Sequence, residues 1–188
     1  MKAAEADILL VPGFTGAGPA HWLSRWQKGM KTARGVDLPN WDAPDLPAWT
    51  DTLVKAVNTS GRPVVLVAHS LGVLAAAHAA AQFNEGRVAG AFMVAAPSAE
   101  WVLMQPDIDP AFAAVPALPL PFTGMLVASR NDEACKFDHA EKIAGSWAVE
   151  LVDAGDAGHI NTASGHGPWP EGALRFARFL GSLKPSGA

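Results

Sequence analysis

The sequence contains one cysteine, Cys135, and it has no cluster of basic residues. A single cysteine excludes an internal disulfide and suits a reducing compartment, so we expect a cytoplasmic protein. Lys and Arg number 14 against 18 Asp and Glu, which gives a net charge of −4. With this balance and no basic patch, we expect neither nucleic acid nor an anionic membrane surface as a partner.

Long apolar runs, internal repeats and low-complexity segments are also lacking. The only apolar run near the start covers residues 8–11, which is too short for the h-region of a signal peptide or for a membrane span. The chain has 188 residues, of which 49% are hydrophobic and 17% charged, enough for one sizeable core. We therefore predict a single domain over residues 1–184, followed by a disordered tail at 185–188.

The most informative stretch runs from Pro63 to Ala81 and reads PVVLVAHSLGVLAAAHAAA. Its first part is an unbroken aliphatic run, typical of a strand that is buried on both faces. Its second part is rich in Ala and Leu, which favour helix. The pattern predicts a strand, a tight turn at Ser70, and a helix over residues 71–81.

The turn, Ala68-His69-Ser70-Leu71-Gly72, has the small-x-Ser-x-Gly pattern of a nucleophile elbow. A serine there lies at a helix N-terminus, where unpaired N–H groups stabilise developing negative charge. Ser70 is therefore the candidate nucleophile, although a serine that only caps the helix would fit the same letters. Ala68 replaces the commoner Gly, so we expect a strained Ser70 backbone with the Leu71 N–H facing open space.

Further apolar runs alternate with helical patterns along the chain. This alternation implies right-handed crossovers and predicts an α/β fold, a three-layer sandwich around a mostly parallel sheet of about six strands. The other predicted strands cover residues 8–11, 36–38, 88–96, 125–129 and 148–152. The other predicted helices cover residues 22–30, 47–57, 136–145 and 171–183.

Residues 97–122 depart from this alternation, because the segment is long and rich in proline. Long segments inside a compact domain are often functional, so we predict a cap over the site, with Trp101 and Met104 as substrate-pocket candidates. A surface excursion that packs its own apolar residues is the alternative.

A serine nucleophile needs a base, and the base needs an orienting acid, in the chain order Ser, acid, His. Asp132 follows the predicted strand 125–129, and His159 follows the last predicted strand; both loops belong at the carboxyl edge of the sheet. We therefore predict Asp132 as the acid and His159 as the base. The alternatives are Glu133, Asp138, Asp153 and Asp156 for the acid, and His166, His139, His69, His21 and His78 for the base.

The glycine-rich turn after the first strand, Gly13-Phe14-Thr15-Gly16-Ala17-Gly18, is placed to supply the second oxyanion donor. We predict the backbone N–H groups of Phe14 and Leu71 as the two donors. A dinucleotide cradle is the competing interpretation of these glycines, but their order is G-x-x-G-x-G, and no Gly-Lys-Ser/Thr follows. We expect no cofactor and no metal.

Several segments together resemble one family: LLVPGFTG, PAHWLSRW, AHSLG, SRNDEAC and AGHINTASGHGPWPEG. They look like the small serine hydrolases named for YdeN and retinoblastoma-binding protein nine, and the resemblance covers essentially the whole chain. It implies a minimal α/β-hydrolase fold and cofactor-free serine hydrolase activity, with Ser70, Asp132 and His159 at the triad positions. His21 and Trp22 match the family's HW motif, which we interpret as structural.

The Leu-x-Cys-x-Glu segment linked to retinoblastoma-protein binding is absent, because Cys135 has Glu133 two residues before it and Phe137 two residues after it. Cys135 is a rival nucleophile, but no histidine follows it in the required order, and a buried inert thiol is the simpler interpretation. The sequence thus predicts a serine hydrolase acting through an acyl-enzyme on a small ester, amide or thioester. The alternative is a non-catalytic interaction module on the same fold.

Overall fold

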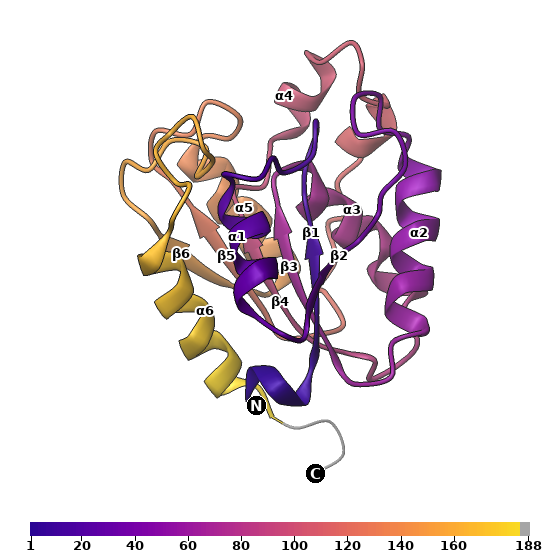
Figure 1. The fold of residues 1–188 in the computed structure, drawn as a ribbon. Coiled ribbons are helices and arrows are strands. Elements are labelled where there is room, and N and C mark those ends of the chain that lie inside the picture. Colours follow the sequence, from indigo (N-terminus) through magenta and orange to yellow (C-terminus); the bar gives the residue numbers. More distant parts are fainter. Residues whose placement is uncertain (185–188) are drawn as a thin grey trace.

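A computed structural model describes residues 1–184, which form a parallel sheet covered by helices on both faces (Figure 1). The strand order is β2-β1-β3-β4-β5-β6, and every neighbouring pair is parallel. This confirms the predicted α/β sandwich of about six strands. The strands are β1 (Asp7–Val11), β2 (Ala33–Gly35), β3 (Val64–His69), β4 (Val88–Val94), β5 (Gly124–Ala128) and β6 (Glu150–Asp153).

The helices follow the strands in alternation, as the sequence pattern predicts. They are α1 (Trp22–Gly29), α2 (Leu46–Asn58), α3 (Leu71–Ala79), α4 (Ala99–Leu103), α5 (Phe137–Trp147) and α6 (Pro170–Ser182), with 3-10 turns η1 (Ala3–Glu5), η2 (Ala80–Gln82) and η3 (Pro110–Ala113). The predicted tail at 185–188 lies outside the described residues. No helix within residues 1–184 has both the length and the hydropathy needed to cross a membrane.

Successive residues of the strands point to opposite faces of the sheet and so divide the core in two. Leu9 and Val11 of β1 pack with α2, α3 and α5, whereas Ile8 and Leu10 pack with α1 and α6. Figure 1 shows α1 and α6 on one side of the sheet. Helix α3 is buried almost all round, which explains why its sequence is apolar without a polar stripe.

Two strands begin two or more residues away from the position that the sequence predicts. The second strand was expected at 36–38, but β2 occupies Ala33–Gly35. Val36 and Leu38 are buried just beyond its end, so their apolar character reflects core packing rather than strand pairing. Strand β6 begins at Glu150, two residues later than expected, because Ala148 ends α5 in the left-handed conformation.

The 97–122 segment carries two short helical pieces that the sequence pattern did not reveal. Phe112 of η3 is fully buried and packs edge-on against Trp49 of α2, at a centroid distance of 5.6 Å. Trp101 belongs to α4, which Figure 1 shows at the carboxyl edge of the sheet. One end of the segment is therefore anchored in the core, while the other borders the region above the strands.

Candidate active site

Ser70 lies in the turn between β3 and α3, with backbone angles φ 54° and ψ −127°. Residues other than glycine rarely adopt a positive φ, so this turn stores local strain. The unusual backbone conformation is the one expected from the sequence. The Ser70 N–H donates to the Val94 carbonyl at 3.0 Å, which ties the turn to the neighbouring strand β4. The sheet thus holds the serine at its carboxyl edge.

Small residues allow this turn to form. A Cβ atom on Gly72 would collide with the main-chain carbonyl oxygens of Val11 and Pro12, which belong to the first strand and its following loop. A Cβ on Gly13 would lie 2.7 Å from the Ser70 Cβ. Ala68, by contrast, is fully buried in the parallel ladder beside Val11, so the strand accommodates a methyl group at that position.

The three predicted catalytic side chains lie in hydrogen-bond contact. The Ser70 hydroxyl oxygen is 2.8 Å from His159 Nε2, and His159 Nδ1 is 2.9 Å from Asp132 Oδ1 and 3.0 Å from Oδ2. Because a carboxylate only accepts, Nδ1 carries the proton and Nε2 is free to accept from the serine. This arrangement can remove a proton from Ser70.

The Asp132 carboxylate is almost completely buried, with 2% of its side chain exposed. Besides His159, its Oδ1 accepts from the Ala134 N–H at 2.9 Å. A buried carboxylate needs such partners, and here they fix its orientation toward the imidazole. The His159 side chain is 12% exposed, so this hydrogen-bonded pair is largely shielded from water.

The alternative candidates for the acid, the base and the nucleophile make contacts elsewhere. Asp153 pairs with Arg130, which lowers the pKa of that carboxyl. His166 is hydrogen-bonded to Ser164 through Nδ1, at 3.1 Å. Cys135 is buried, and burial raises its thiol pKa to about 12, so the thiolate is not available at neutral pH. These contacts leave Ser70 as the nucleophile that the geometry favours.

The predicted oxyanion donors border the same site. Leu71 is the first residue of α3, and Phe14 lines the hollow in front of Ser70. Neither N–H donates to another group of the protein within the described chain. Two unpaired donors beside a nucleophile form the arrangement that stabilises an oxyanion.

The hollow in front of Ser70 has a volume of about 350 Å³. Trp101 forms one wall, with its ring stacked 6.4 Å from the His159 ring at 27°, and Glu133 also lines the hollow. Met104 lines only an adjoining hollow and is 69% exposed. Of the two predicted pocket residues, Trp101 borders the serine hollow and Met104 lies outside it.

Three further residues support the His159 loop, and sequence reasoning did not assign them this role. His69 Nε2 contacts the His159 carbonyl at 3.0 Å, and the Trp22 indole N–H donates to the Ile160 carbonyl at 2.9 Å. Asn131 Oδ1 accepts from the Gly158 N–H at 2.7 Å. The polar run before Asp132 and the histidine beside Ser70 were the available signals, but main-chain partners cannot be identified from sequence.

No group of three or more His, Cys, Asp or Glu side chains within residues 1–184 is arranged to hold a metal ion. Burial, together with the neighbouring His159, lowers the pKa of His21 to about 4. His21 also caps α1, where its Nδ1 accepts from the Leu23 N–H at 3.2 Å, so it has a structural contact of its own.

Comparison with known proteins agrees with this fold. The family model described as serine hydrolase matches residues 8–178. A structure described as a YdeN-like hydrolase from Pectobacterium atrosepticum is 33% identical, with 97% of this chain and 95% of that chain covered and a TM-score of 0.84. The ydeN gene product from B. subtilis is 19% identical over 94% of this chain and 100% of its own, with a TM-score of 0.75. A comparison with functionally curated proteins gave no match.

The fold and the serine turn therefore define an α/β hydrolase. Within that class, the chain belongs to the serine hydrolase family and is a small, YdeN-like member of it. Membership in this family supports a hydrolytic function.

Proposed function

We propose that this hydrolase cleaves a small acyl ester through a covalent acyl-enzyme formed on Ser70, with amides and thioesters as related substrates. The observation that carries the proposal is the continuous chain of hydrogen bonds from Ser70 Oγ through His159 to Asp132, with heavy-atom distances of 2.8 and 2.9 Å. Such a chain converts a weakly nucleophilic hydroxyl into an effective one.

In the first half-reaction, Ser70 Oγ attacks the acyl carbon while His159 Nε2 takes the hydroxyl proton. The carbonyl oxygen becomes an oxyanion, which the N–H groups of Leu71 and Phe14 stabilise. Asp132 stabilises the imidazolium that forms. The intermediate then collapses, the bond to the leaving group breaks, and His159 gives its proton to the departing alcohol, amine or thiol.

In the second half-reaction, a water molecule gives a proton to His159 and attacks the acyl-enzyme. The second tetrahedral intermediate releases the acid and returns the proton to Ser70 Oγ, so the enzyme is regenerated without a cofactor. The hollow of about 350 Å³ fits a small acyl group, with Trp101 as one wall.

Steady-state hydrolysis of p-nitrophenyl esters from acetate to octanoate, alongside matched anilides and thioesters, tests the proposal. We expect turnover of the esters with an initial burst, and a loss of about 10³-fold or more in kcat for Ser70→Ala and His159→Gln. If the folded wild-type protein hydrolyses none of these esters, anilides and thioesters, as expected for Ser70→Ala, the result would instead favour a non-catalytic interaction module.

A further inference from the structure

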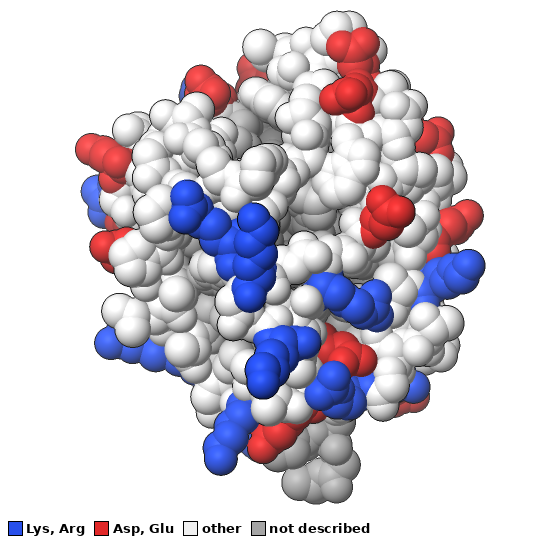
Figure 2. Space-filling view, in the orientation of Figure 1, with Lys and Arg blue, Asp and Glu red and all other residues white. Residues whose placement is uncertain are grey.

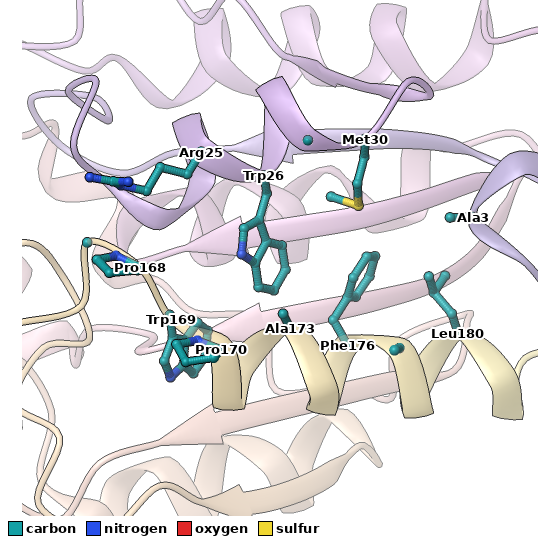
Figure 3. Close-up of a pocket in the computed structure, with 13 residues that line it drawn as sticks. Ala3, Arg25, Trp26, Met30, Pro168, Trp169, Pro170, Ala173, Phe176 and Leu180 are labelled. Atoms are coloured by element: carbon teal, nitrogen blue, oxygen red, sulfur yellow. The ribbon is translucent and has the colours of Figure 1, made fainter.

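A second hollow, larger than the one at Ser70, lies between α1 and α6 and has a volume of about 600 Å³. Figure 3 shows Trp26 of α1, and Met30 directly after this helix, beside Ala173, Phe176 and Leu180 of α6 along this groove. None of its lining residues also lines the hollow at Ser70. The proposed hydrolytic mechanism therefore leaves this groove without a role.

The groove is apolar along its length and open to solvent. The Trp26 and Phe176 rings stack at 5.3 Å, and the Trp26 and Trp169 rings stack at 6.1 Å. Two alanines of α6, Ala173 and Ala177, are exposed along it, so no large side chain fills the space. Covering apolar surface of this kind with a ligand lowers the free energy, because the surface is removed from water.

One end of the groove is positively charged. Arg25 lies there beside Pro168, while Ala3 and Leu180 lie at the other end (Figure 3). Arg25 Nε donates to the Ala20 carbonyl at 3.0 Å, and within residues 1–184 the guanidinium forms no ion pair with a carboxylate. Its terminal N–H groups can therefore bind an anion.

The surroundings reinforce this charge. Helix α1 carries Arg25 and Lys28 and no acidic residue. Figure 2 shows Lys and Arg side chains gathered over α1 and below it, whereas Asp and Glu lie mostly along the top and sides of the view. For a chain with a net charge of −4, this face is locally basic.

The dimensions of the groove limit the kind of ligand that it can hold. The stretch of α6 from Pro170 to Leu180 is about 15 Å long, which gives the groove a mean cross-section of about 40 Å². A helix with its side chains is about 10–12 Å across and needs roughly twice that section. A single alkyl chain fits, and a dodecyl chain spans most of the length.

We propose that this groove binds the anion of a medium- or long-chain fatty acid, with the alkyl chain lying over the stacked rings of Trp26 and Phe176 and the carboxylate on Arg25. Both halves of the ligand follow from the site: the apolar walls require the chain, and the unpaired guanidinium selects the negative head group. A second copy of the protein is disfavoured as the occupant, because a symmetric contact would bring two basic faces together.

Titration calorimetry of the Ser70→Ala protein with dodecanoate, kept below its critical micelle concentration, tests this assignment without turnover. We expect saturable binding of one dodecanoate, about two- to fourfold tighter for each methylene added from octanoate. Dodecyltrimethylammonium should bind at least about tenfold more weakly, because Arg25 repels its head group. Arg25→Gln should weaken dodecanoate about three- to tenfold and leave dodecanol unchanged.

Ala173→Phe places a ring in the groove at an exposed helical position, and Ala177→Phe does so one turn later. Each should remove dodecanoate binding, whereas Leu174→Phe on the same helix, at a residue that does not line the groove, should retain it. Unchanged binding in both alanine variants, or no saturable binding by dodecanoate, would overturn the proposal. Binding only to phosphatidylglycerol vesicles, or self-association blocked by Ala173→Phe, would also overturn it and assign the face to a membrane or to a second copy.

Discussion

The imidazole of His69 supports the main chain of His159: its Nε2 lies 3.0 Å from the His159 carbonyl oxygen, and the two ring centroids are 5.0 Å apart. Because a carbonyl only accepts, Nε2 must carry the proton. His69, the residue before the proposed nucleophile, thus positions the residue that we propose as the base. This contact joins the end of β3 to the loop after β6.

Replacing His69 with Phe should therefore displace the base without removing it. We expect kcat for ester hydrolysis to fall about tenfold to a hundredfold, with KM within about twofold of the wild type, because small displacements of reacting groups are costly. His69→Gln offers an amide N–H near the Nε2 position and should restore much of the loss. Equal kcat for wild type and His69→Phe would exclude this positioning role.

Two buried histidines, His69 and His21, predict how the stability of the protein depends on pH. Burial, followed by the charge of His159, lowers the pKa of His69 well below its ordinary value, and it lowers that of His21 to about 4. The unfolded chain takes up protons on both residues below about pH 6.5, whereas the folded chain does not. Their contribution to stability is therefore complete above about pH 6.5 and is lost as the pH falls toward 4.

Denaturant unfolding between pH 8 and pH 4 measures this effect. The free energy of unfolding should be flat with respect to these two groups from pH 8 to 7 and decline below about 6.5. His21→Gln should make the decline shallower, because one of the two histidines no longer titrates. A decline of the same steepness in His21→Gln and wild type would contradict the assignment.

Trp101 and Met104 should differ in their effect on substrate choice. Trp101 borders the serine hollow, whereas Met104 is mostly exposed beside it. Trp101→Ala should shift the preferred p-nitrophenyl ester toward longer acyl chains, and kcat/KM for the best wild-type substrate should fall about tenfold. Met104→Ala should change the chain-length profile less than twofold. Identical profiles for the two variants would show that the Trp101 wall does not select the acyl group.

Gly72 should tolerate no side chain. A Cβ there would meet two main-chain oxygens, and backbone cannot move aside as a flexible side chain can. Gly72→Ala should therefore lower the free energy of unfolding by about 2 kcal/mol or more. Ala68→Gly, on the other side of Ser70, should cost less, about 1–2 kcal/mol, through the flexibility of the unfolded chain and the loss of one buried methyl group. Chemical denaturation of both variants checks the contrast.

Much of the fold could be predicted because each central strand is buried on both faces and so reads as a continuous apolar run. Edge strand β2, Ala33–Gly35, has no such run, and its position is set by pairing with β1. The elbow was predictable for a different reason, since close contact between the start of α3 and the end of β1 demands a glycine at Gly72, two residues after Ser70. Helix α4 has only five residues, too few to show a helical period.

The same reasoning explains which candidate site residues could be predicted. Asp132 and His159 could be chosen because parallel strands bring their loops to one edge of the sheet. His69 and Asn131 act on main-chain atoms of a distant loop, so their partners exist only in the folded structure. The groove between α1 and α6 could not be predicted, since its residues have the helical spacing of ordinary core positions.

The most direct test of the account is to label the folded protein with a fluorophosphonate and locate the adduct by peptide mass spectrometry. We predict one adduct per chain, on Ser70, because His159 activates that hydroxyl alone. Ser70→Ala should not react, and Asp132→Asn should react far more slowly than wild type. Absence of an adduct on folded wild-type protein, or an adduct on another residue with Ser70 unmodified, would contradict the central claim that Ser70 is the nucleophile.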